Sequence, residues 1–264
     1  MKITALIQVR MKSERLPGKA LLPVDGTPVI GHVVENLRES RYLDDIVICT
    51  TREKDDDALE AFAVDKGVAV YRGDVEDVIK RFHGAALCHG GDVIVRIAGD
   101  CPIVSVDAVD LLVENHLAAG VDYTSIEPDA TPIGSFPQVF SFQALDRLTR
   151  YPLDFNYSEY MLYYFTNNPE VFSLNTVPVP AQYRYPQYRL TLDYEEDLRM
   201  FEALFKKLRE YRLSFSLKNV LLVLQRHPAI AELNSHLIPK YKNIYDGLMD
   251  AIHRATTITS PLPR

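Results

Sequence analysis

Apolar residues occur in two alternating patterns along the first half of the chain. Short, nearly continuous apolar runs lie at Ile3 to Val9, Asp45 to Thr50, Val68 to Tyr71, Asp92 to Ile97 and Val121 to Ser125. Between these runs, apolar residues recur every three or four positions, at 28–37, 55–66, 75–89 and 106–118. The first pattern is typical of strands buried on both faces, and the second of helices that cover them. The alternation therefore predicts a mostly parallel sheet with helices on both sides.

The predicted fold class is α/β, with a doubly wound, Rossmann-like sheet whose first four strands have the spatial order 3-2-1-4. In this order the first and fourth strands are neighbours, and their connections leave to opposite faces. A crevice opens at their carboxyl ends, where proteins of this class bind ligands. We therefore expect functional residues directly after these two strands. Thr27 is expected to cap the first helix, with Pro28 at its first position.

The pattern changes after the fifth strand. Pro128, Pro132, Gly134 and Pro137 predict a loop over 127–138. The remaining expected elements are strands at 139–142, 171–177 and 188–192 and helices at 144–148, 156–168, 195–211, 217–225 and 244–253. We expect one domain over 1–254, in which 127–180 forms a small α+β excursion, and a flexible tail over 255–264.

The composition excludes several classes of function. The chain has 264 residues and a formal net charge of −7, so it lacks the basic face that nucleic acids and anionic membranes require. No apolar run approaches the roughly 20 residues of a membrane-spanning helix. Cys49, Cys88 and Cys101 are odd in number and show no C-x-x-C spacing, which indicates reduced thiols in a cytoplasmic protein.

A cationic loop, Arg10 to Lys19, follows the first predicted strand. It holds Arg10, Lys12, Ser13, Arg15 and Lys19 in an otherwise acidic protein. Loops at the carboxyl end of a strand bind phosphates through backbone N–H groups and fixed cations. The Walker pattern is absent, because Ser13 stands where its first glycine is required, and G-x-G-x-x-G is absent too. The loop as a whole predicts a small polyphosphate ligand, although exposure to solvent would account for any single cation.

Two aspartates are expected at the same edge of the sheet. Asp100 follows the fourth strand in Gly99-Asp100-Cys101-Pro102, and Asp193 ends the strand at 188–192. Mg²⁺ takes one or two protein carboxylates together with phosphate oxygens and water, so these acids are candidate metal ligands. The alternatives are a turn for Asp100 and a helix N-cap for Asp193. Arg96, inside the fourth strand, either reaches the crevice or pairs with a neighbour, since an unpaired charge there is costly.

The cationic loop also carries a family resemblance. The segment Gln8-x-Arg10-Met11-x-Ser13-x-Arg15-Leu16-Pro17-Gly18-Lys19 resembles the signature of sugar-activating cytidylyltransferases, which include the acylneuraminate and 3-deoxy-manno-octulosonate enzymes. The resemblance is strongest to the spore-coat polysaccharide biosynthesis protein F branch. It implies the nucleotide-diphospho-sugar transferase (GT-A-like) version of the fold, CTP as the nucleotide, a sugar acid as the acceptor, Mg²⁺ as the cofactor, and a homodimer. It also implies that the excursion 127–180 binds the acceptor and contributes to the dimer contact.

The resemblance also suggests a role for individual residues. Asp193 lies in Leu192-Asp193-Tyr194-Glu195-Glu196-Asp197-Leu198, which resembles the V-D-x-x-E-D-L segment of the family. Thr50 ends the second strand and Arg72 follows the third, where a simple turn is an equally good interpretation. The expected nucleotide contacts are Gln8, Arg10, Lys12, Ser13, Arg15, Lys19, Thr50, Arg72 and Asp100. The expected catalytic residues are Arg10, Lys19 and Asp100, and the expected metal ligands are Asp100 and Asp193.

The acceptor is left open by the sequence. Gln138 and Glu159 are the candidate contacts, but family members often carry Glu in place of Gln138 and Glu-His in place of Glu159-Tyr160. One hypothesis is CMP transfer from CTP to a nonulosonate-type 2-keto sugar acid, with release of pyrophosphate, for surface polysaccharide synthesis. The others are the same chemistry with another nucleotide, a sugar phosphate or a phosphonate, and a non-catalytic module that binds nucleotide sugars. The aromatic segment Phe155 to Phe165 is expected in a dimer interface or in the core.

Overall fold

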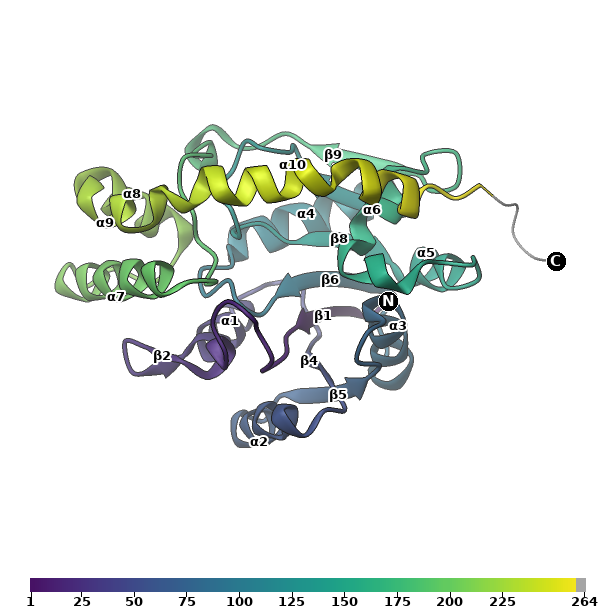
Figure 1. Ribbon diagram of the computed structural model, residues 1–264, viewed down its shortest axis with the longest axis horizontal. Coiled ribbons are helices and arrows are strands. Elements are labelled where there is room, and N and C mark those ends of the chain that lie inside the picture. Colours follow the sequence, from purple (N-terminus) through teal and green to yellow (C-terminus); the bar gives the residue numbers. More distant parts are fainter. Residues whose placement is uncertain (260–264) are drawn as a thin grey trace.

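The computed structural model describes residues 1–259, apart from the side chain of Tyr245. Within these residues the main sheet has seven strands in the order β5-β4-β1-β6-β8-β7-β9. β1, β4, β5 and β6 are parallel and have the predicted 3-2-1-4 order, while β8 runs antiparallel between β6 and β7 (Figure 1). The bounds are β1 (Ile3–Gln8), β4 (Asp45–Thr51), β5 (Ala69–Gly73), β6 (Val93–Ala98), β7 (Tyr123–Ile126), β8 (Gln138–Ser141) and β9 (Leu174–Val177).

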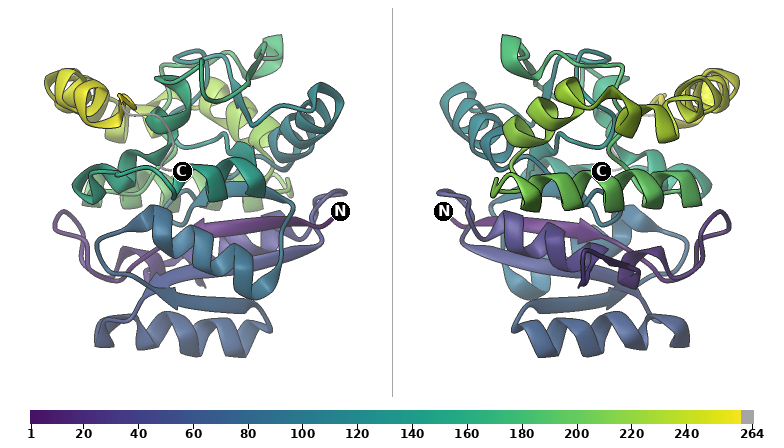
Figure 2. Two further views of the ribbon diagram at one scale, coloured as in Figure 1. Left: turned by 90° about the vertical axis from the view of Figure 1, so that its right-hand side faces the viewer. Right: turned by 90° about the vertical axis from the view of Figure 1, so that its left-hand side faces the viewer.

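Helices cover both faces of this sheet (Figure 2). Side chains alternate along each strand, so that Ile7 points to one face and Leu6 to the other. The first face packs against α1 (Val29–Leu37), α2 (Asp57–Lys66) and α4 (Val106–Ala119). The second packs against α3 (Val78–His89), α5 (Phe142–Leu148) and α6 (Met161–Thr166). Two apolar cores, one on each face, confirm the doubly wound α/β prediction.

A third apolar core lies where the C-terminal helices pack. α7 (Glu195–Glu210) and α8 (Leu217–Arg226) bury Phe201, Phe205 and Leu221 near Val24 of a hairpin formed by β2 (Pro23–Val24) and β3 (Thr27–Pro28). After α9 (Pro228–Ser235), α10 (Leu237–Thr256) runs across the molecule from α9 to α6 (Figure 1). Short 3₁₀ helices lie at Lys19–Leu21, Lys54–Asp56, Phe155–Tyr160 and Ala181–Tyr183. None of the helices in the described part of the chain combines the length and apolarity needed to cross a membrane.

The start of α1 differs from the prediction. Thr27 does not cap a helix but pairs with Val24 in the hairpin, and α1 begins at Val29 with Pro28 in the cap position. The turn of the hairpin places Asp25 and Gly26 at φ values of 53° and 81°, and Asp and Gly are among the residues that tolerate this conformation. The helix start is therefore set by the hairpin rather than by a side-chain cap.

The segment Tyr188 to Leu192 is extended but is not a strand of the main sheet, contrary to the prediction. Arg189 alone forms a bridge in it, to Ile133. The backbone of the segment is held by the loop after β6, because Leu192 N donates to Asp100 O at 2.8 Å. This hydrogen bond, rather than strand pairing, places Asp193 next to Asp100.

The C-terminal end is more ordered than the sequence predicts. α9 has no counterpart in the prediction, and α10 extends well beyond the expected helix over 244–253. Thr256 is fully buried, where Asn167 Nδ2 donates to its hydroxyl and Asn168 Nδ2 to its carbonyl oxygen. The prediction of a flexible tail is therefore wrong for residues 255–258, and residues 260–264 lie outside the described part of the chain.

Candidate functional site

The cationic loop is closed on itself and tied to a neighbouring strand. Gly18 N donates to Met11 O at 3.0 Å, and the φ of Gly18 is 71°, a conformation that favours glycine. The buried carboxylate of Asp56 accepts from Met11 N at 2.7 Å and from Thr51 N at 3.0 Å. Burial raises the pKa of Asp56, but these hydrogen bonds outweigh burial and lower the pKa below its usual value. A charged Asp56 thus fixes the loop to the end of β4.

A cavity of about 740 Å³ opens beside this loop. Its position follows from the parallel pairing of β1 and β6, in which Gln8 lies next to Ala98. We call it the nucleotide cavity, because most of the residues predicted to bind the nucleotide line it, namely Gln8, Arg10, Lys12, Ser13, Arg15, Lys19 and Asp100. The loop and Asp100 face each other across the crevice, as the strand order predicts.

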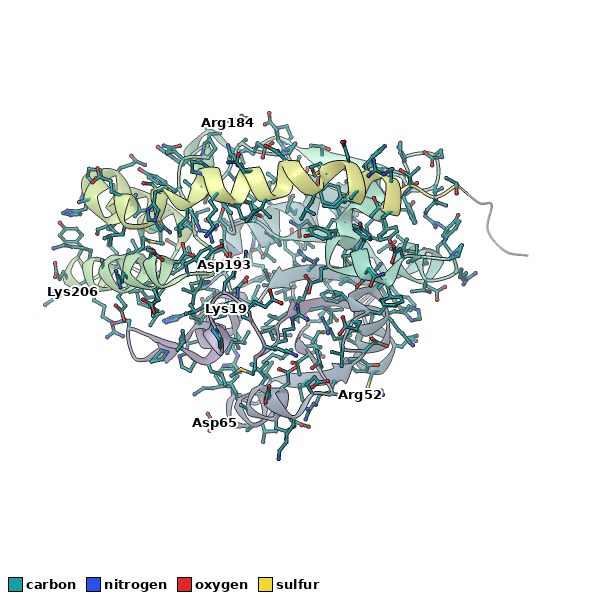
Figure 3. The ribbon with its side chains drawn as sticks, viewed as in Figure 1. Lys19, Arg52, Asp65, Arg184, Asp193 and Lys206 are labelled. Carbon is teal, nitrogen blue, oxygen red and sulfur yellow. The ribbon has the colours of Figure 1, made fainter. Side chains whose placement is uncertain are left out.

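Lys19 joins the two predicted metal ligands. Its Nζ lies 2.5 Å from Asp100 Oδ2 and 2.8 Å from Asp193 Oδ1. Figure 3 shows Lys19 and Asp193 close together near the middle of the molecule. Burial lowers the pKa of Lys19, but the two carboxylates outweigh burial and raise the pKa above 10.5. Lys19 is therefore a largely buried ammonium that stays charged at neutral pH, with 11% of its side chain exposed.

Asp193 is held from its other side by Arg189. Arg189, itself buried, donates from Nη2 to Asp193 Oδ2 at 2.8 Å and from Nε to Asp197 Oδ1 at 2.8 Å. Asp197 also serves the first turn of α7, since its Oδ2 accepts from Asp193 N and Tyr194 N. The helix-cap interpretation of Asp193 is therefore wrong. Its carboxylate faces Lys19 and Arg15, with Arg15 Nη2 at 2.6 Å.

Asp100 and Asp193 are the acidic side chains here that could hold a metal ion, and in this structure both bind the Lys19 ammonium instead. Asp100 Oδ2 and Asp193 Oδ1 come from different parts of the chain and converge on one point, the Lys19 ammonium. Mg²⁺ commonly takes one or two protein carboxylates and completes its shell with phosphate oxygens and water. Residues 1–259 contain no group of three or more Asp, Glu, His or Cys side chains placed to hold a metal ion.

A second cavity, of about 680 Å³, adjoins the first, and we call it the acceptor cavity. Arg15, Asp100 and Glu159 line both cavities. The two cavities therefore meet at the ion pairs of Lys19 and Arg15 with Asp100 and Asp193, which we call the ion-pair cluster. Glu159 accepts a hydrogen bond of 2.7 Å from Arg10 Nη2. The predicted acceptor contact Gln138 lies in the wall together with the aromatic residues Tyr123, Phe136, Tyr160, Tyr163 and Tyr241.

Arg96 both reaches the crevice and pairs with neighbours. It lines the acceptor cavity, while Nη2 donates to Gln8 Oε1 at 2.9 Å and Nη1 to Gln138 Oε1 at 3.1 Å. Arg96 lies opposite Gln138 in the antiparallel pair of β6 and β8, and such partners project from the same face of a sheet. The three side chains form a bridge between the walls of the two cavities.

Two predicted nucleotide contacts lie outside both cavities. Thr50 is fully buried within β4 and lines neither of them. Arg72 lines neither of them either, and its Nη1 binds Asp57 at 2.6 Å and Glu60 at 2.7 Å. These ion pairs join β5 to α2. The structure therefore gives Arg72 a packing role, in place of the predicted contact with the nucleotide.

Three buried charges near the site were not predicted, namely Asp56, Arg81 and Arg189. Arg81 lines the nucleotide cavity from α3. It shares the buried face of that helix with Val78 and Ala85, which are three and four positions away. A charged residue at a position where the helical pattern expects an apolar one can be recognised from the sequence, so Arg81 was open to prediction as a buried functional charge. Asp56 stands in a run of three aspartates and gives no such signal.

The aromatic segment Phe155 to Phe165 is divided between core and surface. Met161, Tyr164 and Phe165 belong to the core beneath α3 and α5. Phe155 is 52% exposed. Cys101, which lines the acceptor cavity, is buried, and burial raises the pKa of its thiol well above the usual value. A packing role suits this thiol better than a nucleophilic one.

Comparison with known proteins gives the family. The family model for cytidylyltransferases matches residues 4–224. The spore coat polysaccharide biosynthesis protein SpsF of Bacillus subtilis (strain 168) is 34% identical over 87% of this chain and 96% of its own length. A 3-deoxy-manno-octulosonate cytidylyltransferase of Pelobacter propionicus (strain DSM 2379 / NBRC 103807 / OttBd1) is 36% identical over 42% of each chain. A solved cytidylyltransferase structure from Leptospira borgpetersenii is 31% identical, covers 88% of this chain and 97% of that chain, and has a TM-score of 0.80.

The matched range includes the site described above except Tyr241, which lies in α10. The cationic loop, Asp100 and Asp193 all fall within residues 4–224, and so do both walls of the crevice between β1 and β6. α9 and α10 lie beyond the matched range. The chain therefore belongs to the cytidylyltransferase family of enzymes.

Proposed function

We propose that this cytidylyltransferase transfers CMP from CTP to a hydroxyl of a 2-keto sugar acid, such as a nonulosonate, and releases pyrophosphate. The product is an activated sugar for the synthesis of a surface polysaccharide or glycoconjugate. The names of two relatives support this assignment, since one refers to spore coat polysaccharide biosynthesis and the other to 3-deoxy-manno-octulosonate, a sugar acid.

The observation that carries the proposal is the meeting of two cavities at one ion-pair cluster. The nucleotide cavity is lined by the cations Arg10, Lys12, Arg15 and Lys19, which suit a triphosphate. The acceptor cavity has aromatic walls and the guanidinium of Arg96, which suit a sugar that carries a negative charge. Because both cavities reach Asp100, two bound substrates would touch there.

The reaction follows from this placement. An oxygen of the acceptor attacks the α-phosphorus of CTP, a new O–P bond forms, and the bond to the pyrophosphate breaks in line. The transfer needs positioning and charge stabilisation rather than a protein nucleophile. The loop cations bind the triphosphate and stabilise the charge that develops on the departing pyrophosphate. Lys19 contributes a buried positive charge at the boundary between the substrates.

Asp100 and Asp193 are the residues that would hold Mg²⁺. When bound, the ion supplies positive charge beside the reacting phosphate. The protein keeps Asp193 in place through Arg189, whose own position is fixed by Asp197. This chain of contacts holds the carboxylate in one orientation, so little reordering is needed when substrates bind.

Release of pyrophosphate tests the proposal. CTP, UTP, GTP and ATP are each supplied with a panel of 2-keto sugar acids and sugar phosphates, with and without Mg²⁺. We expect release only when CTP, a keto sugar acid and Mg²⁺ are all present. Release with a sugar phosphate would keep the chemistry but reject the acid acceptor. Tight binding of CTP without any release would support a binding module instead.

A further inference from the structure

Arg81 is a buried cation with an incomplete set of partners. Its exposed fraction is 2%, and its Nη1 donates to the carbonyl oxygen of Asp74 at 2.9 Å. Its Nε has no hydrogen-bond partner among the described residues. Arg189 is buried to the same extent and its Nη1 also lacks a hydrogen-bond partner among the described residues, but its charge is met by the carboxylates of Asp193 and Asp197. A buried guanidinium that rests on a neutral carbonyl costs stability, so Arg81 needs another explanation.

The position of Arg81 supplies that explanation. Arg81 lines the nucleotide cavity, and burial lowers the pKa of its guanidinium because few groups replace the lost water. It lies in α3, which follows β5, at the end of the cavity that also includes Glu53 and Glu76. Asp100 and Lys19 lie at the other end, after β6 and β1. The sheet order β5-β4-β1-β6 separates these two ends.

The two ends suit different parts of a nucleotide. The reacting α-phosphate has to lie at Asp100, where the acceptor cavity begins. The cationic loop beside it takes the other phosphates. The end near Arg81 carries the carboxylates Glu53 and Glu76. The nearby cation Arg10 is already paired with Glu159, so this end offers a phosphate little free positive charge. An uncharged group with hydrogen-bond acceptors suits this end, and the nucleoside is such a group.

We propose that Arg81 binds the nucleoside half of the nucleotide and donates to acceptor atoms of the base or the ribose. The inference rests on the proposed function, because that function places the triphosphate on the cationic loop. Arg81 is then kept at a cost in stability of the free protein, and the bound nucleoside supplies the missing partner. This role takes the place of the nucleotide contact that the sequence suggested for Arg72.

The test compares Arg81→Met with the unmodified enzyme in two measurements. Methionine is apolar and of similar length, so the melting temperature without nucleotide should not fall. Calorimetric affinities for CMP, CDP and CTP should all fall by the same factor, about 10- to 100-fold, which corresponds to losing hydrogen bonds from a charged donor. UMP and 2′-deoxy-CMP then test two acceptor atoms, since UMP lacks the unprotonated ring N3 of cytosine and 2′-deoxy-CMP lacks the 2′-hydroxyl. The factor shrinks for the ligand that lacks the contacted atom, and an unchanged factor for both points to O2 of the base or to another ribose oxygen.

Arg147→Met is the matched control. Arg147 lies in α5, lines neither cavity, and pairs with Asp122 Oδ2 at 2.8 Å. Its removal should lower the melting temperature, because Asp122 loses its cation, and should leave the three affinities unchanged. The two arginines are thus expected to show opposite patterns, with binding lost in one case and stability in the other.

Three results would overturn the inference. Unchanged affinities in Arg81→Met, with normal binding by the unmodified enzyme, would remove Arg81 from the site while leaving the proposed function intact. A loss that grows from CMP to CTP would make Arg81 a phosphate ligand. If Arg81→Met does not fold, Arg81→Lys keeps the charge but not the planar fork, and unchanged affinities in that variant would count against the inference. Failure of the unmodified enzyme to bind CTP would instead reject the proposed function.

Discussion

Lys19 is the residue on which the ion-pair cluster depends, because its ammonium contacts both Asp100 and Asp193. We predict that Lys19→Met lowers kcat for pyrophosphate release by on the order of 10²–10³, the loss typical of a group that stabilises a transition state. The control is Lys206→Met, at an exposed position of α7 that Figure 3 shows at the periphery. Circular dichroism checks that both variants fold. Equal rates in both would contradict the catalytic role of Lys19.

Asp193 makes stability depend on pH on the acid side. Burial raises its pKa, but Lys19 and Arg15 outweigh burial, so the folded-state pKa lies below the usual value. A depressed pKa means that the contribution of Asp193 is present above about pH 4 and is lost as pH falls through the folded-state value. Asp193→Asn should therefore be less stable than the unmodified protein near neutral pH, and the difference should shrink towards about pH 3.

Denaturant unfolding between about pH 3 and pH 8 measures this difference. Lys19 acts at the opposite end of the range, because its raised pKa keeps its contribution until the solution becomes strongly alkaline. Asp65→Asn, at an exposed position of α2, should show no such change with pH. A constant difference for Asp193→Asn across the range would show that its charge does not matter for stability.

Single residues also show how far a sequence can predict a site. The cations of the loop were predictable because four of them, with Pro17 and Gly18, stand together in an acidic chain. Arg72 was predicted to contact the nucleotide, but in the structure it pairs with Asp57 and Glu60. The sequence could not predict these partners, because they depend on how α2 packs against β5. Arg189 could not be recognised, because its own segment lacks regular strand pairing and its partners, Asp193 and Asp197, lie on either side of the start of α7.

At the scale of elements, Asp56 connects the cationic loop to β4. Asp56→Asn replaces one carboxylate oxygen with an NH₂ group, so the N–H of Met11 or of Thr51 loses its acceptor. We predict a loss of about 1–3 kcal/mol in the free energy of unfolding and a higher KM for CTP. Asp57→Asn, which removes an exposed partner of Arg72, should cost less than about 1 kcal/mol. Thermal unfolding and steady-state kinetics measure both effects, and equal costs would show that Asp56 does not anchor the loop.

α10 supplies part of the acceptor wall through Tyr241. Its far end is fixed where Asn167 and Asn168 bind Thr256. We predict that Tyr241→Ala raises KM for the acceptor about tenfold, the effect of losing one aromatic contact, and leaves KM for CTP nearly unchanged. Kinetics with one substrate varied at a time separates the two constants. A rise in KM for CTP alone would place Tyr241 on the wrong side of the site.

The elements differ in how well the sequence predicts them. Helices with a regular apolar face, such as α4 and α7, were predicted to within one residue at each end. Tyr188 to Leu192 has the composition of a strand, but its backbone bonds to the loops around Ile133 and Asp100 rather than to a neighbouring strand. The start of α10 was not predicted, because the helix has no continuous buried apolar face. Even its apolar residues Ile244 and Leu248 are exposed.

At the scale of the whole molecule, the net charge is negative, while the loop Arg10 to Lys19 that lines one side of the nucleotide cavity holds four cations. Salt screens interactions over about 8–10 Å at physiological ionic strength, so the loop rather than the net charge controls binding of CTP. We predict that KM for CTP rises as potassium chloride is added. KM for a neutral analogue of the acceptor should change little in the same titration. A KM for CTP that falls with added salt would mean that the acidic surface dominates.

The order of the first four strands was predictable from the alternation of apolar patterns. The insertion of β8 was not, because an antiparallel strand that pairs with β6 forms a contact between distant parts of the chain. The homodimer remains a prediction, and the aromatic segment expected at its interface is only partly core, since Met161, Tyr164 and Phe165 are buried whereas Phe155 is exposed. A solution mass of one chain at every concentration would contradict the dimer, and Phe155→Ser tests the exposed end of that segment.

The two cavities share three of their described lining residues, Arg15, Asp100 and Glu159. The remaining acceptor wall comes largely from residues 123–176, whereas the nucleotide wall comes largely from residues 8–20. Mutations in one wall can therefore accumulate over generations with little effect on the other, except at the bridge of Gln8, Arg96 and Gln138. A lineage that inherits this arrangement is free to adapt to a new sugar while it keeps its activating nucleotide, and grafting one segment between relatives becomes a practical way to diversify the sugars that such enzymes activate.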